Sequence, residues 1–257
     1  VLITGAKSLS TRYNPKIGLI RSWDSDPKKW QYAVIIDNMM NLELMLLATK
    51  LSGDQLFKDI ALAHANKTME HHYRADFSCY HVVSYDTISG LPHKKQTHQG
   101  TSNESAWARG QAWGLYGYTV MYRETKDERY LTFANNIAKF LTEHPRMPED
   151  GIPYWDFDAP EIPNEPRDAS AAALMASALI DLSQFVDKDL SAKYMSFAEK
   201  QIRTLASPEY TANLGENGDF ILKHSTGSKP HNSEVDAPLT YADYYYLEAL
   251  LKYKKMY

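Results

Sequence analysis

The segment 97–122, THQGTSNESAWARGQAWGLYGYTVMY, indicates how this chain folds. Its second half has apolar residues at helical spacing, which predicts a helix with a buried face. The first turns of that helix carry Trp107, Arg109 and Trp113, with glycine and alanine between them. Core packing alone does not require this combination, and small spacers would let a ligand approach the backbone. We therefore expect this end of the helix to face a cavity.

Helical segments come in pairs on both sides of this stretch. The predicted helices are 33–51 with 54–72, 106–125 with 127–144, 168–186 with 189–206, and a single helix at 238–255. One pair cannot bury its own faces, so repeated pairs predict an all-α solenoid or a closed toroid. The first helices of the pairs are the more apolar and should lie inside. The second helices carry Lys and Glu and should form an outer layer.

Aspartates and long loops mark the ends of these pairs. Asp54, Asp127 and Asp187 open the second helices, at a position where aspartate caps a helix. The loops that lead into the first helices contain short strand-like pieces at 80–85 and 220–223. Because each loop precedes a first helix, we expect the loops to gather at one end of a single domain, residues 1–257.

The composition limits the kinds of partner. A chain of 257 residues buries a sizeable core, and a net charge of −4 does not favour nucleic acid or anionic membranes. No apolar run reaches membrane-spanning length, and the single cysteine, Cys79, excludes an internal disulfide. The 18 tyrosines and 5 tryptophans suit a protein that lays ring faces against sugars, although aromatic core packing is the simpler explanation.

Asp37 is the leading candidate for chemistry. It follows Val34, Ile35 and Ile36, and a carboxylate buried among such neighbours is costly. Desolvation would raise its pKa into the range that suits a general acid or base. The alternative is an ordinary helix N-cap. The apolar residues before Asp37 favour a functional role.

Arg109 and Trp113 form a second candidate group, because residues four apart share one helix face. A guanidinium binds a carboxylate bidentately, and an indole face stacks on a sugar ring. From the spacing alone, an arginine that pairs with a neighbouring acid is equally well supported. The intervals between His81, His93 and His98 are poor for zinc, so we predict no metal site.

The segment 224–230, HSTGSKP, could hold an anion. Ser225, Ser228 and Lys229 surround a glycine there, and such a loop can bind sulfate. A simple turn is the commoner explanation for this composition.

Five motifs together resemble the unsaturated glucuronyl hydrolases of glycoside hydrolase family 88. They are IIDNMMN (35–41), THQG (97–100), WARGQAWG (107–114), PRDAS (166–170) and YADYY (241–245). The resemblance implies a six-hairpin (α/α) toroid with its active site at one end. By the count of helical pairs, we also expect two hairpins, with a second active-site aspartate, to precede Val1.

Members of that family act on the 4,5-unsaturated uronic acid that polysaccharide lyases leave at the non-reducing end of oligosaccharides. The resemblance implies that Asp37 is the general acid/base in the hydration of a vinyl ether. Matched by motif, the substrate-contacting residues are Trp23, His81, His98, Gln99, Arg109 and Trp113. Some members that accept sulfated fragments carry a Ser-x-x-Ser-x-Lys pattern. Here Ser225 and Ser228 keep the serine spacing, but Lys229 comes one residue early, so acceptance of sulfate is a hypothesis.

Three alternatives stay open. The first is the sister activity on unsaturated galacturonyl-rhamnose, which Gln111 disfavours because that family typically has Asn there. The second is an inverting hydrolase with Asp37 and Asp168 as paired acids. The third is a non-catalytic, sugar-binding helical repeat. We expect an unsaturated oligosaccharide as partner, with no cofactor, nucleic acid or membrane; a cytoplasmic or periplasmic location and the oligomeric state are left open.

Overall fold

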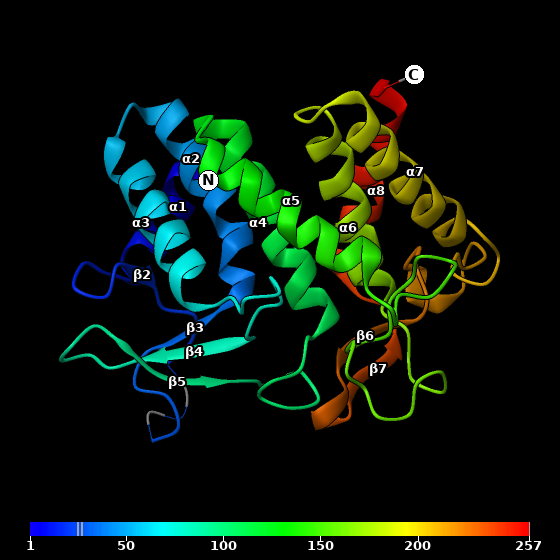
Figure 1. Ribbon diagram of the computed structural model, residues 1–257, viewed down its shortest axis with the longest axis horizontal. Coiled ribbons are helices and arrows are strands. Elements are labelled where there is room, and N and C mark those ends of the chain that lie inside the picture. Colours follow the sequence, from blue (N-terminus) through cyan, green and yellow to red (C-terminus); the bar gives the residue numbers. More distant parts are fainter. Residues whose placement is uncertain (25, 27, 257) are drawn as a thin grey trace.

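The computed structural model describes residues 1–24, 26 and 28–256. In this part of the chain it has eight α-helices, three short 3-10 helices and three small antiparallel sheets, so the fold is mostly helical. Figure 1 shows the sheets together on one side of the helices. None of the helices in the described ranges is long and apolar enough to cross a membrane.

The helices agree closely with the predicted pairs. They are α1 (Leu2–Ser10), α2 (Leu42–Ser52), α3 (Gln55–His71), α4 (Ala108–Thr125), α5 (Glu128–Glu143), α6 (Ala169–Ser183), α7 (Lys188–Leu205) and α8 (Thr240–Met256). The carboxylates of Asp54, Asp127 and Asp187 accept backbone N–H groups at the starts of α3, α5 and α7. The predicted caps of the second helices are therefore confirmed.

Inner and outer helices are distinct in this fold. Helix α4 packs against α2 and α6, and α6 packs against α8, while α3, α5 and α7 each cover one inner helix. Every residue of α6 is buried, as is α4 from Ala108 to Met121. Helices α5 and α7 bury one stripe each and expose the rest. The predicted inner and outer sets are confirmed.

The segment 33–41 differs from the expected helix. It forms strand β3 (Ala33–Ile35) and then a 3-10 helix, η1 (Ile36–Asn41), before α2 begins. Strand β3 pairs with β4 (Val82–Tyr85), which pairs with β5 (Pro92–Gln96). β-Branched Val and Ile fit a buried strand as well as a helix, and here the neighbouring strand decides between them.

The glycines of α4 serve close packing, which corrects the expectation that they admit a ligand. A Cβ on Gly114 would lie 2.1 Å from the Tyr73 hydroxyl, and one on Gly117 would lie 2.4 Å from Met39 Cβ. On Gly110 it would meet the Trp107 ring at 2.8 Å. The small residues therefore let neighbouring side chains and η1 approach α4.

Several short strands were not predicted. They are β1 (Tyr13–Asn14), β2 (Leu19–Ile20), β5, β6 (Ser225–Ser228) and β7 (Ser233–Ala237); the remaining 3-10 helices are η2 (Asn217–Asp219) and η3 (Lys229–His231). The strand expected at 220–223 is absent. Instead, the Ile221 and Leu222 N–H groups donate to the Asp243 carboxylate, at 2.8 and 2.9 Å.

An ionic network joins the C-terminal halves of α4, α6 and α8 to the first turn of α2. Arg123 of α4 bonds Asp181 of α6 at 3.0 Å and also pairs with Glu43 of α2. Lys252 of α8 lies 2.8 Å from Asp181 and 3.1 Å from Glu248. All four inner helices are therefore linked by charged side chains.

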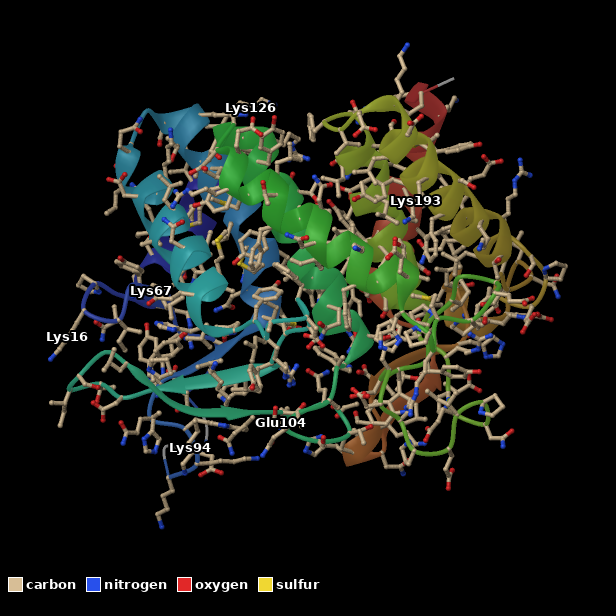
Figure 2. The ribbon with its side chains drawn as sticks, in the orientation of Figure 1. Lys16, Lys67, Lys94, Glu104, Lys126 and Lys193 are labelled. Atoms are coloured by element: carbon tan, nitrogen blue, oxygen red, sulfur yellow. The ribbon has the colours of Figure 1, made fainter. Side chains whose placement is uncertain are left out.

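The periphery of the molecule carries many charged side chains, and several large apolar side chains are exposed there as well. Figure 2 shows Lys16 and Lys94 projecting outward from the ribbon. Six of these exposed apolar side chains form two groups: Met40 of η1 with Leu47 and Leu51 of α2, and Tyr244, Leu247 and Leu251 of α8. These exposed apolar side chains lie on the first and last of the inner helices and on the turn before the first.

Three buried histidines make the fold sensitive to acid. Burial lowers the pKa of His64 to about 3, and lowers the pKa values of His72 and His81 well below 6.5. Between the folded and unfolded pKa values the unfolded chain binds the extra protons, so stability falls as the pH drops below 6.5. We expect each histidine to cost about 1.4 kcal/mol at one pH unit below 6.5.

Urea unfolding at pH 7.5 and pH 5.5 tests this expectation. Neither ring nitrogen of His72 has a hydrogen-bond partner. In His72→Met, one proton fewer should be taken up on unfolding at pH 5.5, so the free energy of unfolding should depend less on pH. Exposed His93 on β5 supplies the control, and His93→Gln should leave the dependence unchanged. Equal stability of the unsubstituted protein at both pH values would contradict the expectation.

Candidate active site

Asp37 lies in the first turn of η1, at the end of the inner helices where the sheets gather. Its side chain is 19% exposed, and its Oδ2 atom has no hydrogen-bond partner. Desolvation raises the pKa of this carboxyl to about 6, although the Arg109 charge and a hydrogen bond from the Trp113 side chain lower it. The N-cap position of η1 is held by Ile35, not by Asp37, and the environment of Asp37 is that of a group that exchanges protons near neutral pH.

His81 lies beside the free oxygen of Asp37. Its Nε2 atom lies 3.8 Å from Asp37 Oδ2, which is too long for a hydrogen bond. Its Nδ1 atom accepts the backbone N–H groups of His98 and Gln99, at 3.0 and 3.1 Å. The structure thus brings the predicted residues His81, His98 and Gln99 together, with His81 facing Asp37.

Arg109 is committed to protein partners. Its Nη1 atom lies 2.8 Å from Asp168 Oδ2 and 2.6 Å from the Thr226 carbonyl, and its Nη2 atom donates to the Gly227 carbonyl at 2.8 Å. The residue is only 2% exposed. This geometry matches the arginine–acid pair that spacing alone supported equally, and a direct contact with substrate stays a prediction.

Aromatic rings line the region between the sheet and the inner helices. Trp23 contacts Trp30 and His98, with centroids 5.1 and 5.5 Å apart. Trp113 of α4 packs edge-on against Tyr245 of α8 and is 4% exposed. Trp23 is half-buried, so it presents more ring surface to a sugar than Trp113 does.

The hairpin formed by β6 and β7 closes one side of the site. The Gln99 side-chain amide donates to the Gly227 carbonyl at 2.8 Å, next to the Arg109 contact. Ser225 is fully buried, and its hydroxyl has no partner. Ser228 Oγ lies 2.7 Å from His231 Nδ1. Both serines therefore belong to the hairpin that Arg109 and Gln99 hold.

Lys229 points to a different partner. Its ammonium pairs with Glu165, whose side chain is 1% exposed and also accepts the Trp155 indole N–H at 2.9 Å. A cavity of about 380 Å³ lies there, between Thr101, Trp155 and Lys229. Glu165 therefore neutralises the one cation of the expected anion-binding loop.

The sequence analysis missed several residues around the site. The centroid of the Trp107 ring lies 4.5 Å from that of the His81 ring. The guanidinium carbon of Arg109 lies 4.6 Å from the centroid of the Trp107 ring. His231 contacts the His98 ring at 4.3 Å. Trp107 stands in the same motif as Arg109, so the sequence held a signal for it. Nothing near His231 or Glu165 in the sequence marks their partners.

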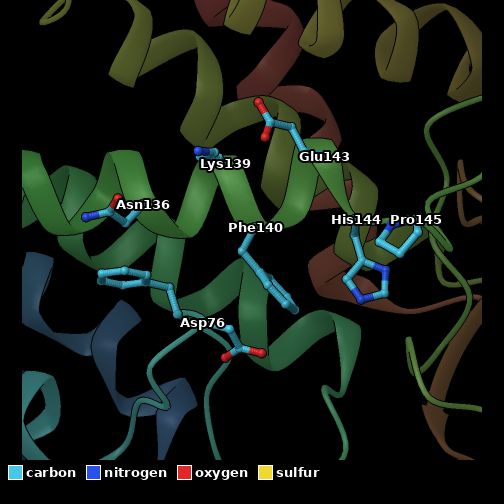
Figure 3. Close-up of a pocket in the computed structure, with 8 residues that line it drawn as sticks. Asp76, Asn136, Lys139, Phe140, Glu143, His144 and Pro145 are labelled. Atoms are coloured by element: carbon cyan, nitrogen blue, oxygen red, sulfur yellow. The ribbon is translucent and has the colours of Figure 1, made fainter.

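A larger cavity lies elsewhere, on the outer side of α5. It encloses about 480 Å³, and Figure 3 shows its lining side chains. They are Asp76, Phe77, Asn136, Lys139, Phe140, Glu143, His144 and Pro145. None of the predicted site residues is among them. Within residues 1–24, 26 and 28–256, no three His, Cys, Asp or Glu side chains are placed to hold a metal ion.

Paired helices that gather a desolvated carboxylate, an arginine and indole rings at one end place the protein in the helical class of glycoside hydrolases. The model of Glycosyl Hydrolase Family 88 matches residues 21–256. The chain belongs to this family, as the five motifs indicated.

Relatives of known name support this membership. The chain is 51% identical to an unsaturated glucuronyl hydrolase of Formosa agariphila, over 97% of this chain and 62% of that protein. It is 55% identical to the crystal structure of an unsaturated glucuronyl hydrolase specific for heparin, with a TM-score of 0.96, over 99% of this chain and 68% of that one. A mutant of the Streptococcus agalactiae enzyme complexed with dGlcA-GalNAc6S is 30% identical, with a TM-score of 0.80, over 100% of this chain and 62% of that one. The chain therefore spans about two thirds of the length of these relatives.

Proposed function

We propose that the protein removes the 4,5-unsaturated uronic acid from the non-reducing end of glycosaminoglycan oligosaccharides produced by lyases. The observation that carries this function is Asp37, a desolvated carboxyl with a pKa of about 6 and a free oxygen that faces His81. The names of the Formosa and heparin-specific relatives point to the same reaction.

The reaction needs one group that is first an acid and then a base. Protonated Asp37 donates its proton to C4 of the double bond, and the resulting carboxylate accepts a proton from the water that adds at C5. The hemiketal then opens and releases the shortened sugar and a 4-deoxy-5-keto uronate. A pKa of about 6 lets Asp37 occupy both protonation states near neutral pH.

The environment of Asp168 argues against a second catalytic acid in this chain. Asp168 is fully buried and paired with Arg109. It also caps α6 through the Ser170 and Ala171 N–H groups. A water-activating base must reach solvent and substrate, and this carboxylate reaches neither. Hydration of a vinyl ether at Asp37 therefore suits the site better than inversion by an Asp37–Asp168 pair.

The whole toroid needs more helices than the described hairpins supply. Apolar side chains of α2 and α8, such as Leu47 and Leu251, are exposed, and the relatives extend beyond the matched region. Two further hairpins would cover these faces and complete a six-hairpin (α/α) toroid. Activity of a version extended to the length of the relatives tests whether they are needed.

A sulfate on the sugar next to the unsaturated uronate would face the β6–β7 hairpin. Ser228 is partly exposed and supplies a hydroxyl there, beside His231, while Ser225 is fully buried and shapes the strand from inside the hairpin. We expect Ser225→Ala plus Ser228→Ala to lower kcat/KM about 10-fold for a sulfated disaccharide, the loss of one hydrogen bond to an anion. The unsulfated disaccharide should be affected much less. If the double substitution leaves kcat/KM unchanged for the sulfated disaccharide as well as for the unsulfated one, the sulfate assignment is contradicted.

Loss of the ultraviolet absorbance of the conjugated double bond tests the function itself. The substrates are unsaturated heparin and chondroitin disaccharides, with an unsaturated galacturonyl-rhamnose and a saturated disaccharide for comparison. We expect loss only with unsaturated glycosaminoglycan fragments. The saturated disaccharide has no such double bond, so its cleavage is followed by the release of reducing sugar. Its turnover would indicate an inverting hydrolase, and binding without turnover of any sugar would indicate a sugar-binding repeat.

A further inference from the structure

The His81 ring is fixed in one tautomer by the turn that follows β5. Two backbone N–H groups, from His98 and Gln99, donate to Nδ1 at 3.0 and 3.1 Å. A nitrogen that accepts hydrogen bonds carries no proton. Burial lowers the pKa of His81 well below its usual value, so the ring is neutral and its one proton is on Nε2.

The protonated Nε2 atom and the free oxygen of Asp37 form an unfilled donor–acceptor pair. They lie 3.8 Å apart, and neither has a hydrogen-bond partner. A hydroxyl or water oxygen placed beside both can accept from His81 and donate to Asp37. With the proton on Nδ1 instead, His81 would present a second acceptor and the pair could not hold such a group.

Asp156 holds the turn that sets this tautomer. Its carboxylate is fully buried and accepts the Thr101 N–H at 2.9 Å, the Ser105 hydroxyl at 2.7 Å and the Asp158 N–H at 2.8 Å. Both carboxylate oxygens are therefore acceptors. The turn also packs tightly on Asp156, because a Cβ on Gly100 would lie 2.9 Å from its Oδ2 atom.

We propose that Asp156 is a positioning residue for the reaction at Asp37. Through the 97–101 turn it aims two backbone N–H groups at His81 Nδ1, and so keeps the His81 N–H directed at the substrate oxygen beside Asp37. This role in the reaction rests on the proposed function, but the tautomer of His81 can be measured without any substrate.

Histidine labelled with ¹⁵N provides that measurement. Two-bond ¹H–¹⁵N correlation spectra distinguish a protonated from an accepting ring nitrogen, and the His81 signals are those lost in His81→Gln. We expect Nε2 protonated in the unsubstituted protein. In Asp156→Asn the amide must turn its NH2 toward a backbone or hydroxyl donor, so the His81 signals should shift toward a mixture of tautomers. Turnover should fall roughly 10- to 100-fold in kcat, with a smaller change in KM.

Asp158→Asn is the matched control. Asp158 is exposed and accepts the Ala106 N–H at 2.9 Å, but it does not bond the 97–101 turn. Its variant should keep the His81 signals of the unsubstituted protein. Thr97→Val is a milder second variant, because it removes only the hydroxyl that accepts the Gly100 N–H at 2.8 Å. It should shift the His81 signals in the same direction as Asp156→Asn.

Two results would overturn the proposal. One is a proton on His81 Nδ1 in the unsubstituted protein. The other is a folded Asp156→Asn protein whose His81 signals are unchanged. If Asp156→Asn does not fold, unchanged signals in Thr97→Val decide against the proposal in the same way. If His81 carries its proton on Nε2 but the protein hydrates no unsaturated sugar, the proposed function is contradicted. The role of Asp156 in holding the 97–101 turn would then still stand.

Discussion

Asp37→Asn is expected to abolish turnover. The variant keeps the shape of the side chain but cannot donate or accept the proton that the reaction moves, and loss of a general acid/base costs about 100- to 10,000-fold in rate. The absorbance of an unsaturated disaccharide, followed at high enzyme concentration, measures this loss. Asp54→Asn is the matched control, because Asp54 caps α3 at the surface, away from the site. It should keep full activity.

The same substitution is expected to stabilise the fold. The folded pKa of Asp37, about 6, lies above its usual value of 3.8. Stability from this group is therefore complete below pH 3.8 and is lost as the pH rises through about 6. At pH 7.5 the ionised carboxyl costs on the order of 3 kcal/mol, which the asparagine avoids. Urea unfolding should show a larger gain at pH 7.5 than at pH 5.

A loss of stability in Asp37→Asn, together with unchanged turnover, would contradict both expectations. Asp37 would then be a structural residue of η1. A gain of stability with full activity would place the proton transfer on another group. Asp54→Asn should change stability by only a few tenths of a kcal/mol, because asparagine and aspartate cap helices about equally well.

Arg109→Met is expected to destabilise the protein by about 3–5 kcal/mol, since it leaves the Asp168 carboxylate buried without a partner. The variant also releases the carbonyls of Thr226 and Gly227, so the β6–β7 hairpin loses its attachment to α4. Chemical unfolding at pH 7.5 measures the loss. Adding Asp168→Asn should restore a large part of it, because the buried charge is then gone.

This double substitution distinguishes two roles of Arg109. An arginine that only binds the substrate carboxylate would raise KM and leave the free energy of unfolding unchanged. An arginine that organises the site changes stability first, and adding Asp168→Asn repairs stability without repairing turnover. An unfolding free energy of Arg109→Met equal to that of the unsubstituted protein would contradict the organising role.

The helices could be predicted because their signals are local. Apolar periodicity and the capping aspartates Asp54, Asp127 and Asp187 lie within each segment, so the sequence alone locates the starts of α3 to α8 to within two residues. The helix predicted over 33–41 was wrong, because whether this segment forms a strand or a helix depends on its pairing with β4, more than forty residues away in the chain.

The site was only partly predictable, for the same reason. Asp37 and Arg109 stand in motifs, but the partner of Arg109 lies 59 residues further along the chain. The β6–β7 hairpin has no strand-like composition, and Asn232, Glu234 and Asp236 adopt positive φ, which a pattern search does not anticipate. The pairing of Lys229 with Glu165 likewise depends on tertiary contacts alone.

The ionic network at the C-terminal ends of α4, α6 and α8 limits where changes of substrate preference can arise during evolution. Arg123, Asp181 and Lys252 fix α4, α6 and α8 at those ends, while Arg109 and Asp168 join α4 and α6 at the others. Helices fastened at both ends cannot slide or rotate independently. Changes of substrate preference are therefore expected to accumulate in the connecting loops and the β6–β7 hairpin, so new sugars can be accommodated without moving the backbone that carries Asp37.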